Sequence, residues 1–212
     1  MRMNKLKTIK YYFICEGSSD TSLVDHIDKL LLESGYEEVY GDAPDFGLIF
    51  DKSVGKSVKD KVNAILKYDN SVNILFIHRD ADNEGYEARE AEIFEQTEHL
   101  EGYKIIPVIP VKRLESWLVL DEQVIKDTVG YPSSRANLGL PAKNHIEKSG
   151  STKELLFEAM DRASGLTGKQ LTKFQKHHNK FRHMLVQNLD PNGPVSTLQS
   201  HVKLRKYIDL LV

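Results

Sequence analysis

The stretch VNILFIHRDADNEG, residues 72–85, joins a continuous apolar run to an acidic turn. Residues 72–79 predict a strand that is apolar along its whole length, as strands buried on both faces of a parallel sheet are. Asp80, Asp82 and Glu84 follow at once, and the pattern then becomes helical. This order predicts a strand–turn–helix unit whose acidic turn lies at the carboxyl edge of a parallel sheet.

Similar units surround this stretch in the chain. Short apolar runs predict further strands over residues 8–15, 46–50 and 103–109. Apolar residues at helical spacing predict helices over residues 23–34, 56–68 and 114–128. Pro107 places the last of these strands at a sheet edge or strand end. The alternation predicts an α/β fold with a mostly parallel, Rossmann-like sheet flanked by helices.

Composition restricts the classes of protein that this chain can belong to. It has 212 residues, a net charge of −2 and a single cysteine, Cys15. One cysteine excludes an internal disulfide framework and a multi-cysteine zinc site, and it fits a reducing compartment. We expect Cys15 to be buried and unreactive in its apolar strand. No apolar run reaches the roughly 18 residues of a transmembrane helix, so we expect a cytoplasmic protein with no membrane partner.

Charge is distributed unevenly on the two sides of Gly130. Residues 1–130 carry 16 Lys/Arg and 25 Asp/Glu, a net charge of −9, whereas residues 131–212 carry 13 Lys/Arg and 6 Asp/Glu, a net charge of +7. An acidic part suits divalent cations and a basic part suits a polyanion, although solvated helix faces would give the same asymmetry. We expect a metal-binding domain over residues 1–130 and a basic extension over residues 131–212 packed on it. The extension is predicted to begin with a loop, 131–151, and to continue with helical stretches over 152–164, 167–189 and 196–211, the second of them with breaks whose positions the sequence leaves open.

Acidic residues follow two of the predicted strands. Glu16 and Asp20 come after the first strand, and Asp80 and Asp82 come after the central one. If the two strands are neighbours, these carboxylates converge and repel each other by several kcal/mol at an effective dielectric near 20. Oxygen ligands without cysteine favour Mg²⁺ or Mn²⁺ as the neutralising ion. Alternatively, Asp20 and Asp82 are ordinary helix caps.

The order strand, Glu16-Gly17, helix, strand, DADNEG (residues 80–85), helix resembles the Toprim domain. That domain occurs in topoisomerases, primases and small nucleases, including nucleases of the overcoming-lysogenization-defect type. Residues 111–121, VKRLESWLVLD, are similar to a segment of small Toprim-related proteins, some of them encoded beside ATPases in anti-phage or restriction loci. The resemblance covers about residues 8–120 and does not include the basic extension.

The resemblance implies a role for individual residues. Glu16 would be a general acid/base or a metal ligand, and Lys112 would stabilise charge on the transferring phosphate. The implied ligands of two Mg²⁺ or Mn²⁺ ions are Glu16, Asp20, Asp80, Asp82, Glu84 and Glu115. The chain has no tyrosine domain of the topoisomerase kind and no primase accessory domain, so the resemblance favours a nuclease.

Basic residues of the extension predict contacts with nucleic acid. Four residues of the extension are candidates for contact with the phosphate backbone: Lys173, Lys176, Lys180 and Arg182. Arg113, which follows the last predicted strand, is a fifth candidate. Such contacts are independent of sequence and sensitive to salt. The alternative is an ordinary amphipathic helix, with Phe174 and Phe181 packed in the core.

These patterns predict a divalent-metal-dependent nuclease that acts on DNA or RNA, with an ATPase as a candidate protein partner. Two alternatives stay open. One is a non-catalytic Toprim-like subunit that binds nucleic acid or regulates another protein. The other is a small-molecule phosphatase, which a DxD motif after a strand would suit, although Asn83 and Glu84 replace the Thr or Val expected there.

Overall fold

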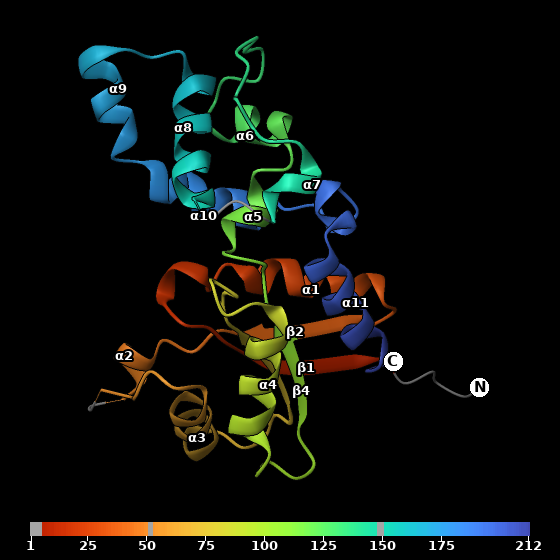
Figure 1. Ribbon diagram of the computed structural model, residues 1–212. Coiled ribbons are helices and arrows are strands. Elements are labelled where there is room, and N and C mark those ends of the chain that lie inside the picture. Colours follow the sequence, from red (N-terminus) through yellow and green to blue (C-terminus); the bar gives the residue numbers. More distant parts are fainter. Residues whose placement is uncertain (1–5, 51–52, 148–150) are drawn as a thin grey trace.

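The structure is a computed structural model that describes residues 6–50, 53–147 and 151–212, and it contains a four-stranded sheet, drawn in the lower half of Figure 1. The strands are β1 (Thr8–Ile14), β2 (Glu38–Asp42), β3 (Ile74–His78) and β4 (Lys104–Val108). Their order is β2-β1-β3-β4, and every neighbouring pair is parallel. The predicted α/β class, with a Rossmann-like sheet and a helical C-terminal part, is confirmed. The edge position predicted from Pro107 is also confirmed, because β4 is an outer strand.

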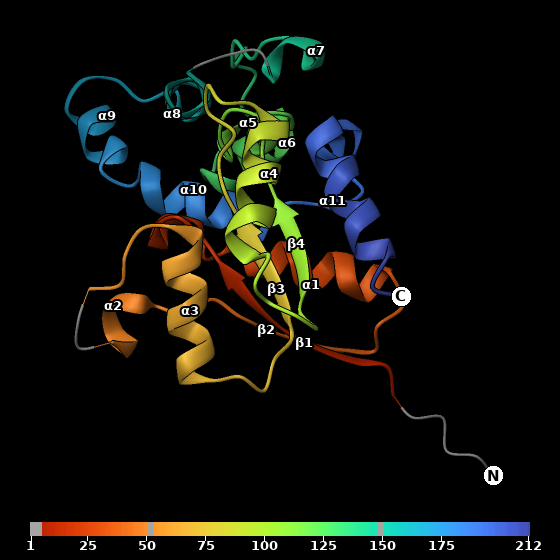
Figure 2. The ribbon, with the colours of Figure 1, turned by 60° about the horizontal axis from the view of Figure 1, so that its bottom comes forward.

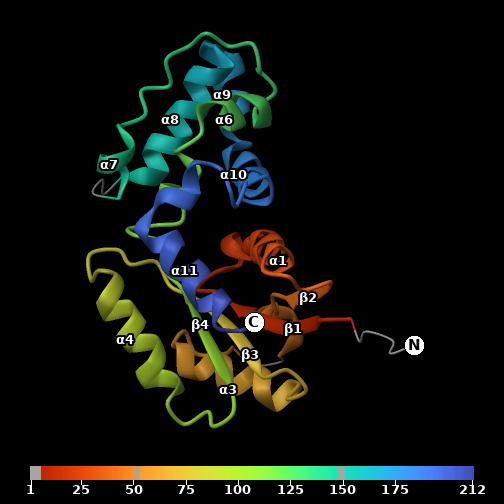
Figure 3. The ribbon, with the colours of Figure 1, turned by 90° about the vertical axis from the view of Figure 1, so that its right-hand side faces the viewer.

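Helices cover both faces of the sheet (Figure 3). One face carries α1 (Leu23–Glu33) and α11 (Gln199–Asp209), and the other carries α3 (Val58–Tyr68) and α4 (Tyr86–Thr97). Strand β1 serves both cores because successive side chains point to opposite faces. Tyr11 and Phe13 belong to the core that contains α1, whereas Tyr12 and Ile14 belong to the core that contains α3.

Six further helices of the described residues form a lobe beyond the carboxyl ends of the strands, as Figure 2 shows for β4, which points toward it. The lobe contains α5 (Glu115–Leu118), α6 (Glu122–Thr128), α7 (Lys143–Ile146), α8 (Thr152–Ser164), α9 (Gly168–Gln175) and α10 (His178–Gln187). A short 3₁₀ helix, η2 (Pro194–Thr197), leads from it to α11. Helices α5 and α6 pack on α8, whereas α11 packs on β4 and α1. Within the described residues, no helix has the length and apolarity needed to cross a bilayer.

The second strand lies at a different place from the predicted one. Residues 46–50 were expected to form it, but the structure has the helix α2 (Phe46–Ile49) there. Asp45 starts this helix, since its side chain accepts hydrogen bonds from two backbone N–H groups of the first turn. The strand is β2 instead, which pairs with β1 at the sheet edge. Its side chains are only partly buried, so it lacks an apolar run.

The lobe also departs from the predicted helices in detail. The single helix expected over 114–128 is divided into α5 and α6, because Asp121 caps α6 through hydrogen bonds from Gln123 N and Val124 N. The stretch 167–189, where breaks were expected, is divided into α9 and α10. The loop expected over 131–151 contains α7, and its residues 148–150 lie outside the described part.

Candidate active site at the carboxyl edge of the sheet

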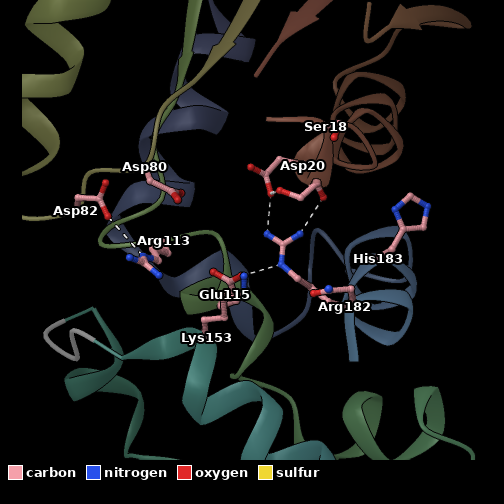
Figure 4. Close-up of a pocket in the computed structure, with 11 residues that line it drawn as sticks. Ser18, Asp20, Asp80, Asp82, Arg113, Glu115, Lys153, Arg182 and His183 are labelled. Atoms are coloured by element: carbon pink, nitrogen blue, oxygen red, sulfur yellow. Dashed lines mark hydrogen bonds and ion pairs between the residues drawn. The ribbon is translucent and has the colours of Figure 1, made fainter. Parts of the chain in front are cut away.

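A cavity of about 510 Å³ lies between the carboxyl edge of the sheet and the lobe (Figure 4). All of its lining residues are polar or charged: Ser18, Ser19, Asp20, Asp80, Asp82, Arg113, Glu115, Lys153, Asn179, Arg182 and His183. Sites for drug-like ligands and most cofactors are lined mainly by apolar side chains. This cavity is therefore suited to a charged and hydrated ligand.

The sheet topology explains why acidic residues meet here. The chain leaves β1 through α1 on one face, and it leaves β3 through α4 on the other face. Loops that follow neighbouring strands to opposite faces diverge and leave a crevice, where α/β proteins bind their ligands. The adjacency expected for the two strands is confirmed, with Ile14 opposite Ile77. Asp20 ends a 3₁₀ helix after β1, η1 (Ser18–Asp20), and Asp80 directly follows Arg79 after β3.

Neither Asp20 nor Asp82 caps a helix. Ser22 occupies the N-cap position of α1, and Gly85 occupies that of α4. Asp82 instead has a left-handed backbone, with φ of 44°, and its N–H donates to Lys112 O at 2.9 Å. Lys112 is left-handed as well, with φ of 67°. Such strain persists only where the surroundings hold it, and here it joins the turns after β3 and β4 beside the cavity.

His78, the last residue of β3, is a site residue that sequence reasoning missed. It is buried, with Nε2 3.5 Å from Asp80 Oδ1 and Nδ1 3.9 Å from Asp20 Oδ2, and neither nitrogen has a hydrogen bond of good geometry to a residue that the structure describes. Burial alone lowers the pKa of His78, but the carboxylates of Asp80, Asp20 and Glu16 outweigh it and raise the pKa. The available signal was a polar residue at the end of an apolar strand.

Arg182 of α10 lies at the inner end of the cavity, not on the surface with the lysines. Its Nε donates to Glu115 Oε1 at 2.6 Å, its Nη2 donates to Asp20 Oδ1 at 2.6 Å, and its Nη1 donates to Ser19 O at 2.8 Å (Figure 4). Burial lowers the pKa of Arg182, but the two carboxylates outweigh this effect and raise it. The expected contact of Arg182 with a nucleic-acid backbone is thus replaced by an internal ion-pair network.

Other acids of the predicted site also have cationic neighbours. Arg79 Nη1 lies 3.6 Å from Glu16 Oε1, and Arg113 Nε lies 3.5 Å from Asp82 Oδ1. The repulsion that we expected among these carboxylates is therefore offset by side chains of the protein itself. Charge balance alone does not require a metal ion.

The carboxylates do not form a ready-made metal cage. Nowhere in residues 6–50, 53–147 and 151–212 do three His, Cys, Asp or Glu side chains group closely enough to hold a metal ion. Mg²⁺, however, is commonly held by one or two carboxylates together with water and substrate phosphate. Asp80 and Asp82 fit such a site, because both line the cavity from one turn and Asp80 is oriented by a hydrogen bond from Leu114 N at 3.0 Å.

Three residues of the predicted site do not line the cavity. The Glu16 side chain is 51% exposed and lies beside Arg79, while its carbonyl accepts a hydrogen bond from Lys61 at 2.7 Å. Glu84 is exposed just before α4, and the Lys112 ammonium points to Asn83 Oδ1, 3.4 Å away. The turn geometry explains this outcome, since consecutive residues of a tight turn point in different directions.

The three lysines predicted to contact nucleic acid lie outside the cavity. Lys173, Lys176 and Lys180 are exposed on α9, the following turn and α10. Phe174 and Phe181 stack on each other with centroids 5.0 Å apart and pack in the lobe, as the amphipathic-helix alternative predicted. Lys153 and Asn179 do line the cavity, although no sequence motif distinguishes them.

Cys15 is buried, as expected, and burial raises the pKa of its thiol to about 11. A cysteine in this state is not a nucleophile at neutral pH.

Comparisons of the chain with protein-family models, curated proteins and solved structures found no match. The geometry of the cavity and the sequence motifs therefore carry the functional argument.

Proposed function

We propose that this chain is a divalent-metal-dependent nuclease of the Toprim type that hydrolyses phosphodiester bonds of DNA or RNA. The observation that carries the proposal is the all-polar cavity at the crevice between β1 and β3, in which acids from both strand ends face cations of the lobe. Asp20, Asp80, Asp82 and Glu115 of the Toprim resemblance all line it. Glu16 and Lys112 keep their proposed catalytic roles only as predictions, because neither lines the cavity.

The acidic and the basic residues of the cavity suit different tasks in phosphodiester hydrolysis, namely metal binding and phosphate binding. Asp80 and Asp82 are the residues that would hold Mg²⁺ or Mn²⁺, which supplies a Lewis acid for the phosphate when bound. Arg113 and Lys153 provide positive charge for the phosphate oxygens. In the reaction, a water molecule loses a proton and its oxygen forms a bond to phosphorus, the bond from phosphorus to the leaving oxygen breaks, and the leaving oxygen takes up a proton.

The exposed lysines outside the cavity extend the proposal to the substrate. Lys173, Lys176 and Lys180 lie on the same lobe that carries Asn179 and His183 into the cavity. A strand whose phosphate enters the cavity would therefore contact them with neighbouring phosphates. The Toprim resemblance adds an ATPase as the candidate protein partner that gates the activity.

A non-catalytic subunit that binds nucleic acid or regulates a partner is the second candidate. The observation in its favour is that Arg182 binds both Asp20 and Glu115, while the described residues contain no preformed metal group. Such a protein would bind nucleic acid through its basic surface and would not turn it over.

A cleavage assay separates the two candidates. Supercoiled plasmid, single-stranded DNA and RNA are incubated with the protein in Mg²⁺, Mn²⁺ or EDTA, with and without a candidate ATPase partner. We expect cleavage that EDTA abolishes and that Asp80→Asn reduces by about a thousandfold or more. Asp209→Asn is the matched control, since Asp209 is an exposed aspartate at the end of α11.

Nucleic-acid binding without turnover under all of these conditions would contradict the nuclease proposal and favour the non-catalytic subunit. Cleavage of equal rate in the wild type and Asp80→Asn would place the reaction at another site. Circular dichroism of both variants checks that the substitutions leave the fold intact.

A further inference from the structure

Arg182 lies where a cation would neutralise two of the predicted metal ligands. Asp20 Oδ1 and Glu115 Oε1 each accept a hydrogen bond from its guanidinium at 2.6 Å, and all three side chains are buried. A guanidinium in this geometry makes strong, charge-assisted hydrogen bonds. A divalent ion between the same two oxygens would have to displace it.

The network retains a negative charge that the guanidinium does not balance. Two carboxylates face one guanidinium, and the second oxygen of Asp20 faces His78 Nδ1 at 3.9 Å. Among the described residues, the buried nitrogens of His78 have no hydrogen-bond partner, although the ring lies between Asp20 and Asp80. Buried ring nitrogens of this kind are commonly satisfied by a water molecule or an ion.

The surroundings allow the guanidinium to move while its helix stays in place. Helix α10 is held on α1, because Lys29 Nζ donates to Gln187 O at 2.6 Å and Gln187 Nε2 donates to Asp25 Oδ2 at 3.0 Å. Arg182 also lines the 510 Å³ cavity, which provides room for another rotamer. Exchange of the guanidinium for a metal ion is therefore a side-chain event.

We infer that Arg182 is an internal counter-ion that competes with a divalent cation for Asp20 and Glu115. This inference rests on the proposed function, in which the first ion is held by Asp80 and Asp82. The second ion of the site then enters only when the guanidinium swings away. The protein therefore binds one ion at low metal concentration. It binds the second ion only at a higher metal concentration, because that ion has to displace the Arg182 guanidinium.

Mn²⁺ binding to variants tests the competition. Arg182→Gln removes the charge, and we expect it to bind one more Mn²⁺ than the wild type, or to bind the second ion at least about tenfold more tightly, in isothermal titration calorimetry. Adding Glu115→Gln to this variant should abolish the gain. Arg182→Lys keeps the charge and should stay within about threefold of the wild type. Arg135→Gln, which removes an arginine that does not line the cavity, is the matched control.

Stability gives a second readout, because Arg182→Gln leaves two buried carboxylates without their cation. We expect its Tm to fall in EDTA and to rise with Mn²⁺ by more than the wild-type Tm does. If the variant does not fold, the wild-type protein provides the test. Titration with Mg²⁺ should then shift the Arg182 Nε–H signal in NMR spectra when the second ion binds. A signal that stays unchanged up to saturating Mg²⁺ would overturn the inference.

The outcomes distinguish this inference from the proposed function. Equal Mn²⁺ binding by Arg182→Gln and the wild type, with binding lost in Asp80→Asn, overturns the role of Arg182 and retains the metal site. A gain in Arg182→Gln that survives Glu115→Gln also overturns it. Absence of Mn²⁺ binding in every variant overturns both.

Discussion

His78 and His26 are both buried, yet their surroundings act on them in opposite directions. His78 lies between the carboxylates of Asp20 and Asp80, which raise its pKa. His26 is a residue of α1 that contacts α11, with its Nε2 2.9 Å from Nε2 of His201, and burial together with that ring lowers its pKa to about 3. One histidine belongs to a charged network beside a cavity, and the other belongs to a neutral network inside the core.

The histidine pair of the neutral network lies among other buried groups, and His201 Nδ1 has no hydrogen-bond partner among the described residues. His26 Nδ1 lies 3.4 Å from Leu189 O. Beside the pair, Trp117 Nε1 donates to Ser200 Oγ at 3.0 Å and Ser200 Oγ donates to Glu147 Oε1 at 2.9 Å. Around His78, by contrast, the acids Asp20 and Asp80 line an open volume. The comparison teaches that the partners of a buried histidine, more than its burial, distinguish a candidate site from a structural contact.

Acidification should produce the largest effect, and it acts through the neutral network. The pKa values of His26 and His201 are lowered to about 3 and about 4, below the value of about 6.5 in an unfolded chain. The unfolded state therefore binds protons first, so the stabilising contribution is complete above about pH 6.5 and falls as the pH drops toward 4. We expect a loss of several kcal/mol in the free energy of unfolding between about pH 7 and pH 4.5, measured with urea.

His201→Gln sharpens that expectation, since an amide keeps a hydrogen bond to His26 and cannot titrate. The variant should show a clearly shallower decline of stability with acid than the wild type. An identical decline in both proteins would mean that other groups, such as the carboxylates, cause the acid sensitivity.

Substitution of His78 tests the charged network. We expect His78→Gln to reduce metal-dependent cleavage by about 10- to 100-fold, because residues that orient metal ligands have effects of this size. The matched substitution His26→Gln should leave the cleavage rate within about threefold when both proteins are folded. Rates that depend equally on the two histidines would remove the distinction between the networks.

The outer lysines of the lobe should have a smaller effect. Replacing Lys173, Lys176 and Lys180 with Gln should weaken binding to single- and double-stranded nucleic acid alike and reduce the salt slope by about 3, one for each phosphate that is no longer neutralised. Fluorescence anisotropy over a series of salt concentrations measures both quantities. An unchanged slope would show that the lysines form only a solvated face.

The smallest effect is expected for the cap that separates α5 from α6. Asp121 accepts hydrogen bonds from Gln123 N and Val124 N, so Asp121→Ala should cost about 1 kcal/mol of stability. Cleavage should not change, because Asp121 does not line the cavity. Urea unfolding and the plasmid assay check the two statements.

The central part of the fold could be predicted because its signals are local. The apolar run before Asp80 and the helical spacing of residues 56–68 correspond to β3 and α3. Strand β2 could not be predicted in this way, since an edge strand with partly buried side chains has no apolar run, and its pairing with β1 is a long-range event. The apolar stretch after Asp45 forms a helix because the Asp45 side chain caps its first turn.

The candidate site was predictable where it depends on strand order, and less so where it depends on side-chain direction. Asp20, Asp80, Asp82 and Glu115 line one cavity, as neighbouring parallel strands require. The direction of Glu16 depends on the turn after β1, which Lys61 holds from α3, and nothing in the local sequence reports that contact. The role of Arg182 depends on a lobe that no motif describes.

Helix α11 has a consequence for the order in which the protein is made. It lies on the same face of the sheet as α1, although the whole lobe separates the two helices in the chain. A ribosome therefore releases all four strands and every lining residue of the cavity, the last being His183, before Leu204 and Ile208 cover that face. A nascent chain at that stage carries every lining residue of the cavity on an incomplete core, so we expect the cavity to take its final shape only after α11 has folded onto the sheet.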